Sequence, residues 1–351
     1  MSVRVFLIYL MLCMPALAQG FADMGSDAEG FALPQADRAL MFPQDHGAHP
    51  EYRIEWWYLT ANLQDADGQD YGVQWTLFRS ALAPQEKSGW ESPQLWMGHA
   101  AVTTKDKHYV AERLSRGGIG QAGVITEPFI AWIDDWQMKS FAAQGVDPIS
   151  RLDLKASGSS FSYDLQLDAK GPLVPQGQQG YSVKSAKGQA SYYYSQPFYG
   201  VTGKLNLPGG EVAVTGQAWL DREWSSQPLA EDQTGWDWLS LHLDTGEKLM
   251  VYRMRDAGEG FTSATWIAAD GTPEPQGPGA LKLTPLETAR VAGRILPIRW
   301  RVELPGKDLD ISTRTLNPDA WMTTQVSYWE GPVRFEGSHR GRGYVEMTGY
   351  E

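Results

Sequence analysis

The chain has 351 residues, of which 42% are hydrophobic, and its 42 Asp and Glu against 30 Lys and Arg give a net charge of −12 at pH 7. This acidic balance argues against nucleic acid as a partner and against docking on anionic lipid headgroups, because neutralising phosphates takes clustered Lys and Arg. The apolar content is sufficient for two hydrophobic cores. Beyond the N-terminus, no segment is long and apolar enough to cross a membrane.

The N-terminus has the pattern of a secretory signal peptide. Arg4 precedes an apolar run, 5–12, that is too short to span a bilayer, and small residues two positions apart lead up to Ala18. Cleavage near Ala18 would remove Cys13, the only cysteine, and with it any disulfide, thiolate ligand or thiol nucleophile. We therefore expect a secreted or periplasmic protein, with 1–18 as signal peptide and 19–41 as a leader segment.

The rest of the sequence is typical of β-strands. Aromatic and β-branched residues, in places in alternation, predict strands at 54–63, 71–77, 95–103, 129–132, 150–156, 161–167 and 188–194. Residues 134–144 fit either a turn of helix or a bulged strand. Since helical periodicity over more than about eleven residues is nearly absent, the sequence predicts an all-β fold.

Internal similarity indicates two copies of one β domain. Residues 55–63 (EWWYLTANL) resemble residues 235–243 (GWDWLSLHL), and both continue through an acidic glycine turn into a strand ending in arginine, Arg79 or Arg253. Two further pairs of segments match: 191–194 with 327–330, and 212–216 with 345–349. We predict two tandem antiparallel β-barrels or sandwiches, at 42–226 and 227–351, with a ligand site in or between them.

The segment at the predicted domain boundary, 219–224 (WLDREW), contains the main candidates for acid–base chemistry. Residues two apart on a strand share a face, so Asp221 and Glu223 should point the same way as Trp219, and Arg222 the opposite way. Paired carboxylates beside indoles could have separated pKa values, one poised as an acid and one ionised. The structural alternative is an Asp221–Arg222–Glu223 network that holds the two domains together.

Three further residues are candidates for catalysis. His99 could carry a proton or be a hydrogen-bonded core residue, and Tyr193 could donate to a developing charge or only pack. Glu55, which precedes the repeated tryptophans, is the third. The residues expected to line the ligand site are Trp56, Tyr58, Trp219, Trp224, Trp236 and Tyr192.

Two motifs match cofactor or metal patterns only in part. Gly118-x-Gly120-x-x-Gly123 has the spacing of a dinucleotide-binding loop, but no helical pattern follows it, which favours a mobile glycine loop. His46 and His49 are three residues apart with a proline behind, unlike the helical two-histidine zinc motif, and turn-fixing hydrogen bonds are the simpler interpretation. We expect neither a cofactor nor a metal.

The segment 45–58 (DHGAHPEYRIEWWY) resembles the opening of the lipocalin-like AttH/carotenoid 1,2-hydratase superfamily, in the branch called predicted secreted hydrolases. Segments 97–100, 190–195, 218–226 and 343–350 support this resemblance, which runs from about residue 42 to the end. It implies two lipocalin-like (calycin) domains with a ligand cavity in or between them. Relatives include hydratases that protonate an alkene and add water, and cyclising enzymes that shape a polyene.

In these hydratases the resemblance implies that a strand Asp, preceded two positions earlier by an aromatic residue, is the proton donor. Trp219-x-Asp221 matches that pattern. The chain departs from it in having only tyrosines at 192–194, where a hydratase would have a histidine nearby, and this argues against carotenoid hydration itself.

The leading hypothesis is thus a hydrolase or hydratase acting by acid–base chemistry on a lipid- or isoprenoid-like molecule, with Asp221 as the acid. The alternative is a non-catalytic periplasmic carrier of a hydrophobic ligand, since lipocalin-like barrels bind as readily as they catalyse. A binder of surface polysaccharides through exposed indoles is a third interpretation.

Overall fold

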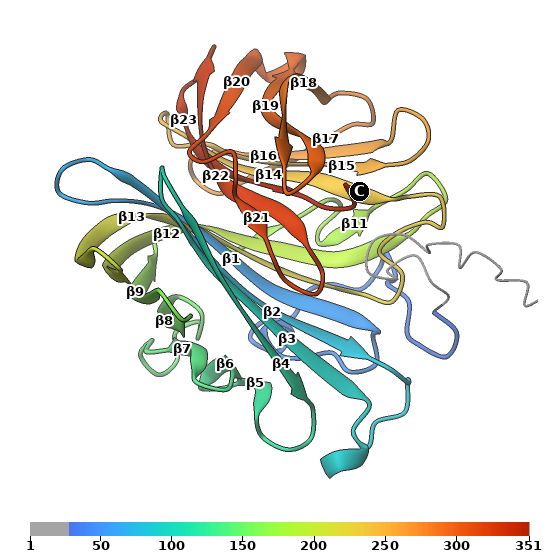
Figure 1. Cartoon of the computed structure of the whole chain (residues 1–351). Coiled ribbons are helices and arrows are strands. Elements are labelled where there is room, and N and C mark those ends of the chain that lie inside the picture. The colour runs from blue at the N-terminus through green and yellow to red at the C-terminus, as the bar shows by residue number, and fades with distance from the viewer. Residues whose placement is uncertain (1–27, 351) are drawn as a thin grey trace, which may run out of the picture.

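The computed structural model describes residues 28–350, which form two antiparallel β-sheets packed against each other (Figure 1). The all-β prediction is confirmed, because the described helices are three single turns of 3-10 helix: η2 (Gln44–His46), η3 (Gly89–Glu91) and η4 (Pro305–Lys307). None of these described helices has the length or apolar composition to span a bilayer. The expected signal peptide lies outside the described residues.

The first sheet has thirteen strands in the order β4-β3-β2-β1-β13-β12-β9-β8-β7-β6-β5, and β10 and β11 also pair with β12. The strands are β1 Ile54–Gln64, β2 Asp70–Ala81, β3 Gln94–Thr103, β4 His108–Arg116, β5 Ala122–Thr126, β6 Phe129–Ile133, β7 Trp136–Ser140, β8 Arg151–Ser157, β9 Ser162–Ala169, β10 Val174–Pro175, β11 Tyr181–Val183, β12 Ala190–Leu207 and β13 Gly210–Ser225.

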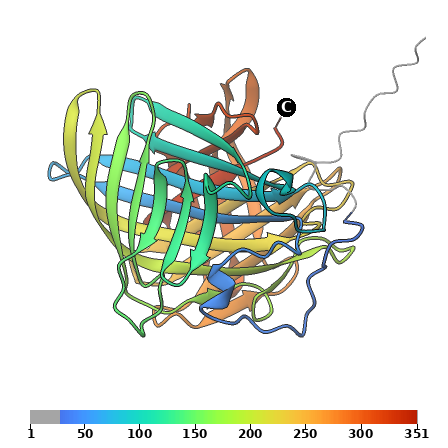
Figure 2. The ribbon, with the colours of Figure 1, turned by 90° about the horizontal axis from the view of Figure 1, so that it is seen from below.

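This sheet curls until its two ends meet (Figure 2). Strand β6, near one end, packs against β2, β3 and β4 at the other, so the sheet nearly closes into a barrel. Alternate residues along each strand point inward, and large side chains such as Trp57, Trp75 and Trp136 fill the interior.

The second sheet has ten strands in the order β17-β16-β15-β14-β23-β22-β20-β19-β18, with β21 paired to β22, and forms a half-barrel. The strands are β14 Gly235–Leu243, β15 Lys248–Arg255, β16 Phe261–Ile267, β17 Pro273–Gln276, β18 Lys282–Val291, β19 Arg294–Leu304, β20 Leu309–Thr315, β21 Trp321–Met322, β22 Tyr328–Gly337 and β23 Gly341–Met347. Its own core contains Trp300 and Trp329. A third apolar cluster lies between the two sheets and includes Tyr58, Tyr193 and Trp238.

The predicted duplication is visible in the strand order. The run β12-β13-β1-β2-β3 of the first sheet corresponds to β22-β23-β14-β15-β16 of the second. If Leu59 is matched with Leu239, as the sequence suggests, their cross-strand partners Leu220 and Val345 are matched too. One position further along, Asp221 therefore corresponds to Glu346.

The same registers correct two of the sequence matches. Because Ser195 lies opposite Asp221 and Glu330 lies opposite Glu346, Ser195 corresponds to Glu330, and 191–194 matches 327–330 only after a shift of one residue. The match of 212–216 with 345–349 is wrong, since Val345 corresponds to Leu220. Alternating sequences can be aligned in several registers, and only the hydrogen-bonded pairing selects one.

The structure also shows the conformation of two segments that the sequence left open, 134–144 and the glycine segment at 118–123. Residues 134–144 contain strand β7 rather than a helical turn, and the chain turns into it through Asp134 at a φ of 52°. The glycine segment near 118–123 runs directly into strand β5, whose residues pair with β6. Each of these strands is only five residues long, which leaves too few positions for a clear alternation in the sequence.

A buried ionic cluster ties the N-terminal segment to the first barrel. Glu55 is fully buried and forms ion pairs with both Arg79 and Arg222. The His49 backbone N–H donates to Glu55 Oε1 at 2.9 Å, and the Arg222 guanidinium lies 3.8 Å from the centre of the Trp57 ring. Burial alone would raise the pKa of Glu55, but the two arginine charges outweigh it and hold the pKa well below its ordinary value.

The alternative of an Asp221–Arg222–Glu223 network is therefore wrong. Arg222 points to the barrel side of β13 as strand alternation requires, and its carboxylate partner is Glu55 of the neighbouring strand.

Replacing Glu55 by Gln should destabilise the protein by about 3–5 kcal/mol, because two buried guanidinium groups would lose their compensating charge. Chemical denaturation measures this loss. The matched control is Glu211→Gln, whose pair with Lys204 spans 2.9 Å but is exposed to solvent, so its loss should change stability far less. Equal stability of the two variants would show that Glu55 does not organise this end of the barrel.

Candidate functional site

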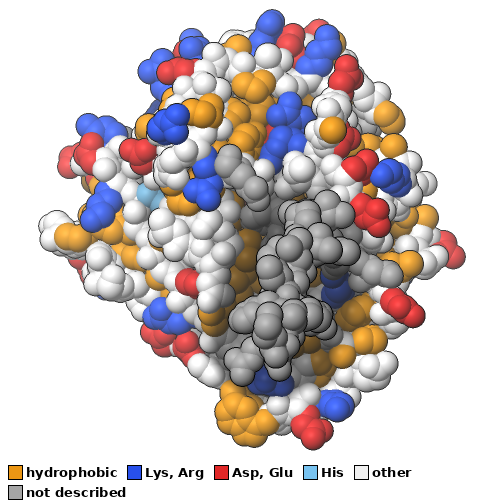
Figure 3. All heavy atoms as spheres, turned by 45° about the vertical axis from the view of Figure 1, so that its right-hand side comes forward, with side chains coloured by type: hydrophobic (Ala, Val, Ile, Leu, Met, Phe, Trp, Pro, Cys, Tyr) orange, Lys and Arg blue, Asp and Glu red, His pale blue; other side chains and the backbone are white. Residues whose placement is uncertain are grey.

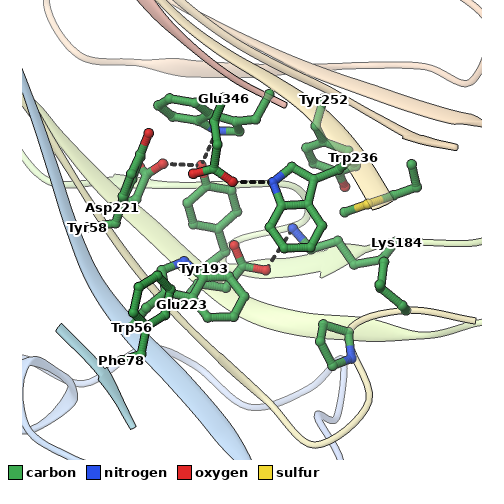
Figure 4. A pocket seen from close by; sticks show the side chains of 14 residues that line it. Trp56, Tyr58, Phe78, Lys184, Tyr193, Asp221, Glu223, Trp236, Tyr252 and Glu346 are labelled. Carbon is green, nitrogen blue, oxygen red and sulfur yellow. Dashed lines mark hydrogen bonds and ion pairs between the residues drawn. The ribbon is translucent and has the colours of Figure 1, made fainter. Parts of the chain in front are cut away.

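A cavity of about 60 Å³ lies between the two sheets and is lined by side chains from both (Figure 4). It borders the third apolar cluster, so its walls are mainly aromatic. The lining residues are Trp56, Tyr58, Phe78, Lys184, Tyr193, Asp221, Glu223, Pro228, Leu229, Trp236, Trp238, Tyr252, Met254 and Glu346.

Asp221, on β13, is almost fully buried in this cavity and accepts three hydrogen bonds. Ser195 Oγ donates to Oδ1 at 2.5 Å, Trp219 Nε1 donates to Oδ1 at 2.6 Å, and Tyr193 OH donates to Oδ2 at 2.6 Å. The Tyr193 oxygen in turn accepts from Trp238 Nε1 at 3.1 Å. Burial raises the pKa of Asp221 to about 7 even though these donors favour the ionised form.

Glu223 shares the face of Asp221 but has a different environment. Lys184 Nζ lies 2.8 Å from Glu223 Oε1, and Ser191 Oγ also donates to that oxygen. The ammonium group lies between two phenol rings, 4.7 Å from the centre of Tyr193 and 4.4 Å from that of Tyr252. Burial alone would lower the pKa of Lys184, but the charge of Glu223 raises it, so the two form a buried ion pair.

The second sheet contributes a carboxyl group of its own. Glu346, on β23, accepts a hydrogen bond of 2.5 Å from Trp236 Nε1 and extends into the same cavity as Asp221 (Figure 4). Burial, together with the negative charges of Asp221 and Glu223, raises its pKa to about 7 in spite of the Trp236 and Tyr58 donors. The duplication of the fold thus brings equivalent carboxyl groups of the two sheets into one cavity.

A third acidic group lies beside them. Glu330 is fully buried and accepts a hydrogen bond of 2.6 Å from Tyr58 OH. Burial and the charge of Glu346 raise the pKa of Glu330 well above its ordinary value. Its surroundings in the wall between the sheets therefore favour the neutral form of this carboxyl group.

A larger cavity of about 500 Å³ adjoins the first. Phe78, Trp236 and Glu346 line both. Its other walls combine apolar side chains with polar ones. The apolar residues are Ile54, Leu95, Trp96, Met97, Leu114 and Val326, and the polar ones are Ser80, His99, Ser115, Arg116, Gln325, Tyr328 and Thr348. The two cavities together have the size and character of a site for a hydrophobic small molecule.

The structure brings six of the proposed site residues together in the smaller cavity: Asp221, Glu223, Tyr193, Trp56, Tyr58 and Trp236. Trp219 lies behind Asp221 as a hydrogen-bond donor. Asp221, Glu223 and Trp219 share a face, as strand alternation predicted.

The other proposed residues lie elsewhere. Glu55 belongs to the ionic cluster of the first barrel, and Trp224 and Tyr192 pack in the core of that barrel. His99 lines the larger cavity, with Nδ1 2.9 Å from Tyr328 OH and Nε2 3.2 Å from Glu112, and burial lowers its pKa. One position along a strand reverses the face, which separates Trp224 from Glu223 and Tyr192 from Tyr193.

Sequence reasoning missed Lys184, Trp238, Tyr252 and Glu346. No sequence pattern pointed to Lys184 or Tyr252. Only the packing of the sheets brings the turn after β11, which holds Lys184, and strand β15, which holds Tyr252, next to Asp221. Trp238 and Glu346 lay within recognised repeats, and a correct register would have matched Glu346 with Asp221.

The two histidines considered as metal ligands have other partners. His46 Nδ1 lies 2.6 Å from Tyr194 OH, and His49 stacks on Trp224 with ring centres 4.0 Å apart. Among residues 28–350, no group of three or more His, Cys, Asp or Glu side chains is arranged to hold a metal ion.

Several solved structures are similar to this architecture. A crystal structure of an AttH-like protein from Nitrosomonas europaea is 33% identical, with a TM-score of 0.81 and a match covering 92% of this chain and 100% of that one. Kievitone hydratase from Nectria haematococca is 17% identical (TM-score 0.65, covering 91% and 98%), and CghA, solved with Sch210972, is 13% identical (0.55, covering 92% and 97%). The last two are similar in fold alone. No curated protein matches the sequence.

The predicted resemblance is also confirmed at the level of the whole sequence. The model of the AttH-like family matches residues 33–350, which include both sheets and every residue of the cavity. The chain belongs to the AttH-like family.

Proposed function

We propose that this protein is an acid–base enzyme of the hydratase type that acts on a hydrophobic small molecule bound between its two sheets. The observation that carries this proposal is Asp221, a buried carboxyl group that is still partly protonated near neutral pH and faces an aromatic cavity. A general acid works best when its pKa lies near the working pH, and burial without a cationic partner is a way to reach that value.

The first step is proton transfer from Asp221 to one carbon of an alkene. The π electrons form the new C–H bond, and the neighbouring carbon becomes cationic. Ser195, Trp219 and Tyr193 then stabilise the carboxylate that is left, since all three donate to its oxygens. The π faces of Trp56 and Trp236 in the cavity wall supply a favourable environment for the cation.

The second step is addition of water to the cationic carbon. Glu346 is the group suited to take the proton released by that water, because it lines the same cavity from the opposite sheet and is ionised in part at neutral pH. The net reaction joins alkene and water into an alcohol. Return of the proton from Glu346 to Asp221 restores the starting state.

Two observations favour proton addition over hydrolysis. Both serines near the cavity, Ser191 and Ser195, donate to carboxylates, and no histidine is among the lining residues that could activate them. Kievitone hydratase, a protein that shares the fold, is the second support, as an analogy of architecture only.

The proposal includes export from the cytoplasm. Its support is the N-terminal pattern of Arg4, the apolar run and the small residues before Ala18.

Asp221→Asn should reduce turnover at least about 100-fold, because the amide keeps the shape of the side chain but cannot donate an acidic proton. The assay incubates the protein with panels of hydrophobic alkenes and esters in ¹⁸O-labelled water and detects the label by mass spectrometry. Ligand uptake, followed by tryptophan fluorescence, should persist in the variant. The exposed Asp168→Asn is the control.

An unchanged rate in Asp221→Asn would remove this residue from the mechanism. A wild-type protein that retains a co-purifying apolar molecule through organic extraction, and converts no member of either panel, would be a carrier.

Activity should fall as the pH rises through about 7, because the reacting form of Asp221 is the protonated one. A pH–rate profile with the first substrate found tests this directly. A rate that instead rises through this range would assign Asp221 to the role of base.

The same group makes stability depend on pH. Its pKa is about 7 in the folded protein against an ordinary 3.8, so the folded state holds a proton that the unfolded chain releases. This stabilisation is complete below about pH 4 and is lost toward pH 7, by up to ~4 kcal/mol. We expect denaturation experiments to show that, as the pH rises from about 4 to 7, wild type loses stability relative to Asp221→Asn, which has no such proton to release. Parallel curves would mean that the pKa of Asp221 is the same in both states.

A further inference from the structure

A row of arginines crosses the second sheet, away from the acidic cavity. Arg314 on β20 lies directly opposite Arg334 on β22, and Arg334 lies directly opposite Arg342 on β23. Directly paired residues on neighbouring antiparallel strands project from the same face. Val333 and Phe335 on either side of Arg334 belong to the core of this sheet, so the arginine row projects from the opposite face.

Two open cavities adjoin this row. One, of about 590 Å³, is lined by Arg299, Arg314, Arg334, Arg340 and Arg342, with Asp244 and Glu336 as the acidic members. The other, of about 370 Å³, shares three of these arginines and adds Lys105 and Asp70 from the first sheet. The combined lining thus has six basic and three acidic side chains, a local charge of 6 − 3 = +3 in a chain whose net charge is −12.

Three of these six basic side chains, Arg299, Arg314 and Arg340, have no ion pair within residues 28–350, and Lys105 has only an exposed pair with Asp106 at 3.9 Å. Asp70 binds Arg334 at 2.6 Å and lies 3.7 Å from Arg342. Arg314 and Arg340 are exposed, and their guanidinium groups have no hydrogen-bond or ion-pair partner within residues 28–350. Burial and the neighbouring charge of Arg334 lower the pKa of Arg342, which reflects the crowding.

Such an arrangement does not stabilise the sheet. Like charges directly opposite each other on neighbouring strands are destabilising. Cross-strand pairing of opposite charges is seen nearby, where Arg301 on β19 binds Asp310 on β20 at 2.7 Å. On the face shown in Figure 3, basic, acidic and hydrophobic side chains are interspersed. What sets the row apart is that three arginines lie directly opposite one another across three strands, and a bound anion would offset their repulsion.

The geometry points to a phosphate-bearing ligand at the arginine row, and we propose that these two cavities form a phosphate-binding site. Guanidinium groups donate paired hydrogen bonds that match the oxygens of a phosphate, and several converging on one cavity suit a doubly charged group. The smaller cavity also presents Leu316 and Pro332 next to the arginines. Both a soluble organic phosphate and the phosphate headgroup of a lipid have this chemistry.

The site is independent of the proposed acid–base function. It shares no lining residue with the cavities around Asp221 and His99. Its test therefore requires neither an enzyme substrate nor turnover, and it can fail while the proposed function stands.

The test compares two double variants of the full chain. Arg314→Ser with Arg340→Ser removes the two unpaired guanidinium groups. Arg290→Ser with Arg301→Ser removes the same charge from exposed positions on β18 and β19 outside both cavities. Because all four side chains are exposed, both variants should fold, and circular dichroism checks that they do.

Two kinds of probe distinguish the source of the phosphate. Isothermal titration with inorganic phosphate and with pyrophosphate measures binding of a free anion. Co-sedimentation with vesicles of phosphatidylcholine, alone or mixed with phosphatidic acid, measures binding of a lipid headgroup.

We expect wild type and the Arg290/Arg301 variant to bind at least one probe saturably, and the Arg314/Arg340 variant to bind it about tenfold more weakly. Binding should also weaken with added salt, since the row is exposed. Preference for pyrophosphate would assign a soluble phosphate, and retention only on phosphatidic acid vesicles would assign a lipid. Absence of binding to all probes, or equal binding by the two double variants, would overturn the proposal.

Discussion

The packing of one sheet against the other is the constraint on which the functional part of this protein depends. The strands of both sheets that carry the repeated tryptophans meet through an aromatic cluster, and this cluster buries Asp221 almost fully and Glu346 in part. Neither carboxyl group has a cation as its hydrogen-bond partner. Desolvation therefore dominates over their neutral donors, and the pKa of each rises to about 7.

Glu55 shows how strictly the environment decides the state of a carboxyl group. It lies on β1, which pairs with the strand of Asp221, and it is as deeply buried. Two guanidinium groups face it, so it stays ionised and stabilises the barrel. The same chemical group is thus a structural anion on one face of these paired strands and, on the other, the proton donor of the proposed reaction.

The duplicated fold explains both the symmetry and the asymmetry of the site. Equivalent positions of the two sheets supply Asp221 and Glu346, whereas Ser195 is replaced by Glu330 in the second copy. The arginine row has diverged as well, because the position of Arg342 corresponds to Gln217 in the first sheet. Two copies of one sheet have in this way acquired an apolar acid–base cavity and a separate basic surface.

The sequence by itself determined the all-β class, the duplication and the family, because alternation of side chains and the repeated EWWYL-type segment are local properties of the chain. It also placed Asp221 and Glu223 on one face, since strand geometry fixes which neighbours share a face. The tertiary structure decided the register of the repeats, the partner of Arg222 and the meeting of Lys184 and Glu346 with Asp221. It also decided that arginines from separate strands meet in an acidic chain. These contacts join residues far apart in sequence, and only the pairing of strands and the packing of the two sheets determine them.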